Sequence, residues 1–241
     1  IKPDVLLQYT IKPNIYGTIV ASMLNIPTIN NITGLGILFV KQSLITKIAK
    51  WFYKVSQKKA TKVFFQNQDD FKIFADEGLI AQEKCDVLPG SGVDIETFKP
   101  EEKEDDGVFR FLLASRMLWE KGIKEFVEAA EIIKQKYPNV QFQILGHLDI
   151  NNPSAISKEQ MNIWVKDGYV NYLGSSDNVR IEISKADCIV LPSFYREGTP
   201  RILLESASMA KPIITSNNVG CRDVVDDGIN GYLCEVRNAQ D

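Results

Sequence analysis

The chain has 241 residues, 44% hydrophobic and 24% charged, which is typical of a soluble α/β protein with enough core for one large or two modest domains. Its net charge of −3 gives no general reason to expect nucleic acid as a partner. The charge is uneven, since residues 1–92 hold eleven lysines against seven acidic residues, a net charge of +4 that leaves −7 for residues 93–241. We interpret the first part as able to face an anionic surface.

The first 92 residues alternate short apolar runs with helical patterns, which predicts a parallel sheet with helices on both faces. We expect strands over Val5–Tyr9, Pro27–Ile32, Lys62–Gln66 and Cys85–Leu88, and helices over Ile15–Leu24, Ser43–Lys59 and Asp69–Glu77. A glycine loop, Asn31–Gly36, follows the second strand, where open parallel sheets bind ligands. From its spacing alone, this lone Gly-x-Gly favours a plain turn by about two to one.

The predicted helix Ser43–Lys59 is basic and amphipathic. Residues 41–62 include seven lysines and no acidic residue, while apolar residues recur at helical spacing at Leu44, Ile45, Ile48, Trp51, Phe52 and Val55. In one interpretation the helix lies on an anionic membrane surface. In the other, its apolar residues face the core and its lysines face solvent. The two are equally supported, and both can hold at once.

A turn at Leu88–Asp94 and an acidic stretch at Glu101–Gly107 predict a domain boundary near residues 89–107. The second domain repeats the alternation more regularly. We expect strands over Phe109–Ser115, Val140–Gly146, Val170–Gly174, Cys188–Pro192 and Pro212–Ser216, and helices over Ile123–Tyr137, Lys158–Lys166, Asn178–Lys185 and Pro200–Ala210. This pattern predicts a Rossmann-like, doubly wound domain. No Gly-x-Gly-x-x-Gly follows its first strand, which disfavours an NAD enzyme.

The loop between the strand Cys188–Pro192 and the next helix has the features of an anion site. Thr199 suits the position before the helix and Pro200 its first turn, so free backbone N–H groups at Arg201 and Ile202 would point at the end of the sheet.

Glu197 lies in this loop and Glu205 on the helix, separated by about 7 Å of helical rise. Two carboxylates at this separation could each accept hydrogen bonds from a different part of one hydroxyl-rich ligand. On spacing alone, a capped helix with two solvated glutamates has about equal weight.

Two cations could converge on the same edge of the sheet. Arg116 follows the strand Phe109–Ser115, and Lys121 lies at the entry to the next helix. An arginine and a lysine near a helix start suit a diphosphate. The alternative is a surface ion pair with Glu120 or Glu125, which would be favoured without the Glu197 loop.

Several chemistries are disfavoured. The only histidine, His147, follows a strand end, but no serine or cysteine nucleophile motif accompanies it, so a hydrolase triad is unsupported and its role is left open. Cys85, Cys188, Cys221 and Cys234 lack paired ligand spacing, which predicts reduced thiols and neither disulfides nor zinc. The longest apolar runs are far shorter than the roughly 20 residues of a membrane span, and no signal peptide is present.

Several motifs occur together in a specific order. Arg116 and Lys121 form Arg-x4-Lys-Gly, Glu197 and Glu205 form Glu-x7-Glu, and Gly220–Gly231 follows. From about Lys2 onward the chain resembles the family 4 glycosyltransferases, which have the GT-B fold. This resemblance implies an α/β protein of two Rossmann-like domains, with residues 1–92 as a partial N-terminal acceptor-side domain and 93–241 as the nucleotide-sugar-binding domain. The chain begins next to the strand Val5–Tyr9 and ends just after the strand-like Gly231–Val236, so we expect a fragment. The resemblance implies a further glycine loop before the first of these strands, so we expect the fragment to lack part of the active site.

The resemblance also implies an enzyme, a hexosyl- or N-acetylhexosaminyltransferase that retains anomeric configuration and requires no metal or cofactor. Catalytic contacts would come from Arg116 and Lys121 on the diphosphate and from Glu197 on the hydroxyls of the donor sugar. Donor-binding contacts would come from Glu205 on the ribose, from Leu173 and Gly174 near the base, and from the backbone of Gly198, Thr199, Pro200, Arg201 and Ile202 at the phosphate.

The glycine loop, the insertion Asn151–Ile156 and Asp223 resemble the subgroup that extends undecaprenyl-diphosphate-linked sugars in bacterial surface polysaccharide or glycoprotein glycan synthesis. This implies a UDP-N-acetylhexosamine donor, a lipid-linked or other saccharide acceptor, and a cytoplasmic protein that contacts the inner face of the membrane through residues 41–62. The acceptor or cleft loop would comprise Thr33, Gly34, Leu35 and Gly36.

One departure from the family bears on that loop. Many members have a histidine in the loop, where this chain has Thr33. The role of that histidine in the family therefore cannot be assigned to this chain. Two alternatives to the transferase stay open: a GT-B-like UDP-sugar epimerase, and a nucleotide-binding fragment without catalysis.

Overall fold

The computed structural model describes residues 3–36, 44–148 and 151–241. They form two compact units. The first unit comprises Ile1–Gly92 together with Arg196–Pro200, and the second comprises Val93–Tyr195 together with Arg201–Asp241. The segment Arg196–Pro200 therefore belongs with the first unit, although its chain neighbours on both sides belong to the second.

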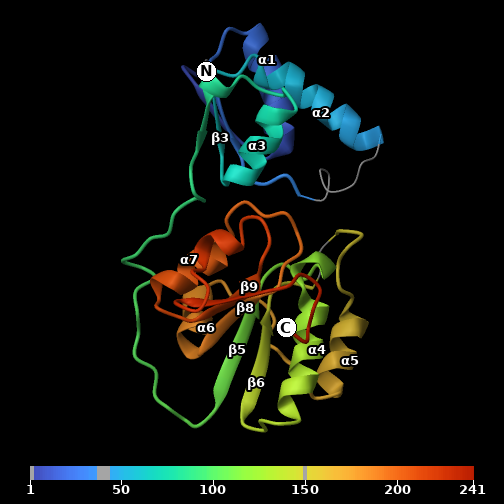
Figure 1. The fold of residues 1–241 in the computed structure, drawn as a ribbon, viewed down its shortest axis with the longest axis vertical. Coiled ribbons are helices and arrows are strands. Elements are labelled where there is room, and N and C mark those ends of the chain that lie inside the picture. The colour runs from blue at the N-terminus through green and yellow to red at the C-terminus, as the bar shows by residue number, and fades with distance from the viewer. Residues whose placement is uncertain (1–2, 37–43, 149–150) are drawn as a thin grey trace. The chain divides into compact units, whose positions relative to one another are not determined.

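The first unit is built on a parallel four-stranded sheet in the order β1-β2-β3-β4. Its strands are β1 (Leu6–Tyr9), β2 (Thr28–Ile32), β3 (Lys62–Phe65) and β4 (Cys85–Val87). A turn of π-helix (Pro13–Gly17) leads into α1 (Thr18–Met23), and α2 (Leu44–Gln57) and α3 (Gln68–Asp76) follow, as labelled in Figure 1. Three rings, Tyr53, Phe65 and Phe74, pack edge to face in the core.

Apart from Tyr53, helix α2 turns small and polar residues toward this core. Asn30 on β2 donates to Gln57 Oε1 (2.7 Å) and to Thr18 Oγ1 (2.9 Å), and Gln57 Nε2 donates to the carbonyl of Asn14 (2.9 Å). All four of these residues are buried. Because buried amides are costly unless they are paired, this network fixes the face of α2 that meets the sheet.

The opposite side of α2 is apolar and exposed. Leu44, Ile45, Ile48 and Trp51 are 73%, 67%, 48% and 60% exposed, so the interpretation that places them against the core is wrong. The two neighbouring aromatic residues differ from these four, because Tyr53 is buried in the core cluster and Phe52 packs on it from a half-buried position. Within the described ranges, no helix has the length and apolar character that crossing a bilayer requires.

The second unit has a parallel six-stranded sheet in the order β10-β9-β8-β5-β6-β7. Its strands are β5 (Phe109–Ala114), β6 (Val140–Leu145), β7 (Asn171–Tyr172), β8 (Cys188–Leu191), β9 (Ile213–Ser216) and β10 (Gly231–Cys234). Starting at β5, the strands β6 and β7 are added toward one edge of the sheet, and β8, β9 and β10 are then added toward the other edge. This is the Rossmann order, with its switch point between β5 and β8.

Helices cover both faces of this sheet (Figure 1). On one face, α4 (Ile123–Lys134) and α5 (Lys158–Lys166) pack on alternate strand residues such as Leu113 and Ile144. On the other, α6 (Val179–Lys185) and α7 (Arg201–Ser208) pack on the intervening residues, such as Leu112 and Ile189 for α6 and Leu191 for α7. The period of two along each buried strand therefore assigns every side chain to one helical layer.

Candidate functional site

A pocket of about 430 Å³ opens in the second unit at the carboxyl ends of β5 and β6. In an open α/β sheet this is the edge where ligands bind, next to the switch point. The residues that line it come from loops after three strands and from α6 and α7: Ala114, Ser115, Arg116, Leu145, Gly146, His147, Ser175, Ser176, Val179, Ile202 and Glu205.

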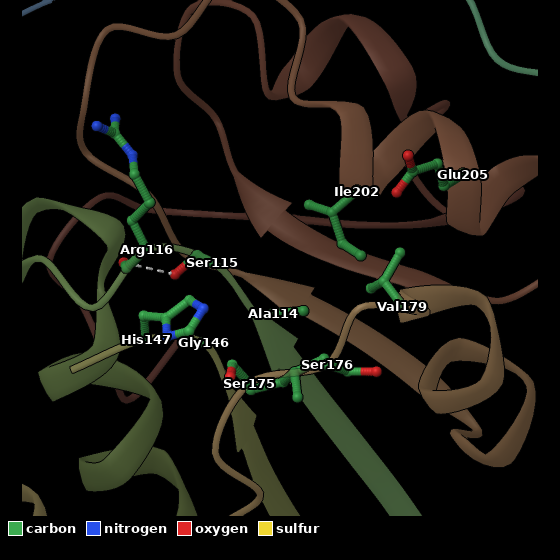
Figure 2. Close-up of a pocket in the computed structure, with 11 residues that line it drawn as sticks. Ala114, Ser115, Arg116, Gly146, His147, Ser175, Ser176, Val179, Ile202 and Glu205 are labelled. Carbon is green, nitrogen blue, oxygen red and sulfur yellow. Dashed lines mark hydrogen bonds between the residues drawn. The ribbon is translucent and has the colours of Figure 1, made fainter. Parts of the chain in front are cut away.

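The structure brings Arg116 and Glu205 into this one pocket, although they are 89 positions apart in the sequence. Figure 2 shows Arg116 and His147 on one side and Glu205 with Ile202 on the other. The Ser115 hydroxyl donates to the carbonyl of Arg116 (3.0 Å), which ties down the backbone where the chain leaves β5. A cation and an acceptor on opposite walls suit a ligand with an anionic part and a hydroxyl-bearing part.

Glu205 is 7% exposed and lies on the inward side of α7. Burial raises the pKa of its carboxyl, and the charge and hydrogen bond of Arg201 oppose that rise. The Arg201 guanidinium forms an ion pair with it at 3.2 Å, one turn earlier on the same helix. Arg201 itself is mostly exposed. The helix and the ion pair with Arg201 therefore hold the Glu205 carboxylate at the wall of the pocket.

Lys121 is not among the described residues that line the pocket; it is only 8% exposed. Its Nζ lies 5.3 Å from the centre of the Tyr195 ring. The following Gly122 has φ of 76°, and a Cβ added there would come within 2.0 Å of the Pro192 carbonyl oxygen at the end of β8. Glycine is needed at this point, and it brings the Lys-Gly pair close to the chain that leaves β8.

A hydrogen-bonded turn holds the chain after β8. The carbonyl of Glu120 accepts from the backbone N–H groups of Phe194 (3.0 Å) and Tyr195 (3.1 Å). Asn218 Nδ2 donates to the carbonyls of Ser193 (3.2 Å) and Tyr195 (2.9 Å). Residues 193–195 are thereby fixed within the second unit.

The next five residues, which carry Glu197, are held within the first unit. Asn67 Nδ2 donates to the carbonyl of Glu197 (3.3 Å), and the backbone N–H of Thr199 donates to Gln66 Oε1 (3.3 Å). The Thr199 N–H is thus occupied by a side chain in this structure and is not offered to a phosphate. We expected Pro200 to be the first residue of the helix, but α7 begins at Arg201 and Pro200 directly precedes it.

The glycine loop packs against this same segment. Gly34 has φ of 115°, and a Cβ there would lie 2.6 Å from the backbone nitrogen of Gly198. A Cβ on Gly198 would lie 2.7 Å from the carbonyl of Thr33. The backbone N–H of Gly36 donates to the carbonyl of Arg196 (3.2 Å). The two facing glycines allow the two backbones to come into contact, so this loop packs on the segment that carries Glu197. Leu35, in the same loop, is a core residue.

Comparison with known proteins assigns the family. Residues 94–241 match the family described as "Glycosyl transferases group 1", and residues 1–67 match "Glycosyl transferase 4-like". This chain belongs to the group 1 glycosyltransferases. The first of these matches covers more than half of the chain, including the whole pocket.

Two curated relatives of this glycosyltransferase align along nearly all of it. The N,N'-diacetylbacillosaminyl-diphospho-undecaprenol alpha-1,3-N-acetylgalactosaminyltransferase of Campylobacter jejuni is 30% identical over 95% of the chain. The UDP-Gal:alpha-D-GlcNAc-diphosphoundecaprenol alpha-1,3-galactosyltransferase of Escherichia coli is 26% identical over 98% of it. The chain spans 63% and 64% of the lengths of these two relatives.

Solved structures share the fold. The Anabaena protein HepE in complex with UDP-glucose has a TM-score of 0.79 at 18% identity, with 98% of this chain and 66% of that chain covered. Sucrose-phosphate synthase from Thermosynechococcus elongatus has a TM-score of 0.82 at 17% identity, with 98% and 61% covered. The expected fold class, Rossmann-like α/β domains of the GT-B type, is confirmed.

Part of this glycosyltransferase's pocket was missed by sequence reasoning. Ser175 and Ser176 line it, whereas the expected Leu173 and Gly174 lie just before them and do not. His147 lines it too, and the sequence leaves its role open. All three follow the carboxyl ends of strands, and that rule of position could have found them. Among the described residues, no group of three His, Cys, Asp or Glu side chains could hold a metal ion.

Proposed function

We propose that the whole protein transfers a sugar, of the N-acetylhexosamine class, from a UDP-sugar to a saccharide carried on a polyprenyl diphosphate. The single observation that carries the donor half of this proposal is the pocket that joins Arg116 and Glu205 at the switch point of the second unit. The acceptor half is supported by the names of the two relatives from Campylobacter jejuni and Escherichia coli, both of which act on undecaprenyl-diphosphate-linked sugars.

The transfer breaks the bond between the anomeric carbon of the sugar and the β-phosphate oxygen, and UDP leaves with the electron pair. The acceptor hydroxyl oxygen forms the new bond to that carbon and loses its proton. Negative charge grows on the departing diphosphate, so cationic groups that are already in place lower the barrier. Arg116 supplies such a group from the pocket wall. We assign the same role to Lys121, whose ammonium group is held next to Tyr195.

The two glutamates position the donor in this proposal. Glu205 accepts hydrogen bonds from the ribose hydroxyls, and Glu197 accepts them from the transferred sugar. A double-displacement glycosidase would instead need two carboxyl groups about 5 Å apart on either side of the bond. The backbone around Ile202, at the start of α7, would face the phosphate end of the donor.

Helix α2 provides a means of reaching an acceptor at a membrane. Its exposed side combines Leu44, Ile48 and Trp51 with the exposed lysines Lys47 and Lys54. Apolar side chains can enter the headgroup region while lysines bind anionic lipids. We therefore include peripheral contact with an anionic bilayer in the proposed function.

Binding of UDP tests the donor site. Arg116→Ala should weaken UDP binding by about 1–3 kcal/mol, the range for a charge-assisted contact, as measured by titration calorimetry. Arg110→Ala is the matched control, because Arg110 lies at the opposite end of β5, where it pairs with Asp106. Equal affinity in the wild type and both variants would remove the phosphate assignment.

Product analysis tests the reaction itself. Full-length protein incubated with UDP-N-acetylhexosamine and a polyprenyl-diphosphate-linked sugar should yield an acceptor heavier by one N-acetylhexosamine residue, by mass spectrometry. An altered donor sugar without acceptor would indicate an epimerase, and UDP binding without any product would indicate a protein that binds nucleotide only. Either of these outcomes would contradict the proposed transfer.

A further inference from the structure

One short stretch of the first unit holds the segment that carries Glu197 at several points. Gln66, Asn67 and Asp70 lie at the end of β3 and the start of α3. Gln66 accepts from the Thr199 N–H and Asn67 donates to the carbonyl of Glu197. Asp70 forms an ion pair with Arg196, with 2.6 Å between Arg196 Nε and Asp70 Oδ1.

The Asp70 to Arg196 pair is buried on the carboxylate side. The Asp70 side chain is 0% exposed and the Arg196 side chain 19% exposed. Asn67 orients the carboxylate by donating to Asp70 Oδ2 (3.2 Å), while its own Oδ1 accepts from the Asp70 N–H (2.7 Å) and caps α3. Asn67 at the helix start and Arg196 thus both orient the Asp70 carboxylate.

A buried ion pair is a poor source of net stability, because both charges lose their hydration. What it does provide is a single geometry, since a buried carboxylate tolerates only arrangements that keep its partner. Arg196 directly precedes Glu197 in the chain. The position of the Glu197 backbone is thus set by the carboxylate of Asp70, which lies 127 positions earlier in the sequence.

We infer that Asp70 is a positioning residue for Glu197, acting through Arg196 to hold the segment Arg196–Pro200 in the arrangement that sugar transfer requires. This inference rests on the proposed function for the role of Glu197, and on the contacts alone for the ordering of the segment. Asp70 touches neither nucleotide nor sugar in this account. The pocket residues Arg116 and Glu205 belong to the second unit, so loss of the Asp70 charge should leave UDP binding unaffected.

The test uses Asp70→Asn, which keeps the shape of the side chain, and Arg196→Gln in the full-length protein. Each should lower kcat for sugar transfer at least about tenfold while UDP affinity stays within about twofold of the wild type. The double variant should be no slower than the slower single variant, because both remove the same interaction. Arg196→Lys should recover part of the rate because it keeps the charge.

Hydrogen–deuterium exchange gives a readout that does not depend on catalysis. In both single variants, peptides that cover residues 194–200 should exchange faster, and peptides from α7 should be unchanged. Asp86→Asn is the control, because it breaks the Lys62 to Asp86 pair of the same unit without touching this segment. It should change neither kcat nor exchange in residues 194–200.

Several outcomes would overturn the inference. Unchanged kcat with only a lowered melting temperature would reduce Asp70 to a stabilising role, and unchanged exchange in residues 194–200 would remove the ordering role. If Asp70→Asn fails to fold, Arg196→Gln decides, because its side chain lies nearer the surface. Failure of the wild-type protein to bind UDP or transfer sugar would instead count against the proposed function, and the exchange data would still decide on the positioning.

Discussion

Glu205 is a carboxylate whose pKa depends on its surroundings. Its folded pKa lies above the usual value of 4.5 because of burial, and Arg201 limits the rise. A group with a raised pKa takes up its proton at a higher pH than an ordinary glutamate does. In the proposed donor complex, protonation replaces a charge-assisted hydrogen bond to the ribose by a neutral one, which is weaker by about 1 kcal/mol.

We therefore expect UDP affinity to fall as the pH decreases from neutral toward 4.5, about fivefold more in the wild type than in Glu205→Gln. The comparison with Glu205→Gln removes the titration of the diphosphate itself. Arg201→Ala should move the loss to higher pH, because it removes the group that lowers the pKa of Glu205. Parallel pH profiles for all three proteins, by calorimetry, would contradict the assigned role of Glu205.

Gly122 allows a separate test at the residue scale, because it combines a left-handed backbone with a close neighbour. Gly168 in the same unit has nearly the same φ, 78° against 76°, but no atom lies within 4 Å of an added Cβ. Gly168→Ala should cost about 1 kcal/mol in the free energy of unfolding, from the backbone strain alone. Gly122→Ala should cost at least about 2 kcal/mol more, because its Cβ would meet the Pro192 carbonyl. Urea denaturation measures both, and equal losses would mean that the neighbour yields easily.

At the scale of elements, α2 has its faces arranged in an unusual way. Apart from Tyr53, the residues that face the core are small or polar, such as Gln57, which bonds Asn30, whereas Leu44, Ile45, Ile48 and Trp51 face outward. The helix therefore presents apolar side chains and lysines together. Lys50 differs from the other lysines of the helix, because it pairs with Glu77 on α3's C-terminal side at 2.6 Å.

Vesicle sedimentation tests the proposed membrane contact of α2. Replacing Lys47, Lys54 and Lys58 by glutamate should sharply reduce binding to anionic vesicles, since each lysine contributes about 1 kcal/mol at such a surface. Added salt should have a similar effect on the wild type. Trp51→Ala should weaken the apolar part of the contact. Reversal of Lys12, Lys72 and Lys136, three exposed lysines outside α2, is the matched control. Equal recovery of wild type and triple variant on anionic vesicles would exclude the electrostatic contact.

At the scale of the whole molecule, the fold could be predicted from the sequence because its signals are local. Buried parallel strands such as β5 and β8 are short apolar runs, and helices between them repeat every three to four residues. Each expected element is present, with ends that differ by at most three residues, as at α4, which stops at Lys134 where we expected Tyr137. Helix ends are the least determined feature, since capping competes with packing there.

The site could be predicted only in part. Arg116 could be placed at the site because it follows the carboxyl end of β5, whereas Glu205, which lies on α7, was expected there only from the family resemblance of the Glu-x7-Glu motif. The contact of Asp70 with Arg196 could not be predicted, because no local pattern links residues 126 positions apart. The exposed side of α2 was uncertain for a similar reason. Its orientation depends on a buried amide network, and period alone treats those amides as surface residues.

The assignment of Arg196–Pro200 to the first unit has a consequence for exchanging parts between related transferases. The chain passes between the two units three times, after Gly92, after Tyr195 and after Pro200. A chimera joined only at Gly92 would therefore take Asp70 from one parent and Arg196 from the other. A donor half transplanted in this way is compatible only with a host that supplies a matching carboxylate, so the pair acts as a compatibility requirement between the halves of such a hybrid enzyme.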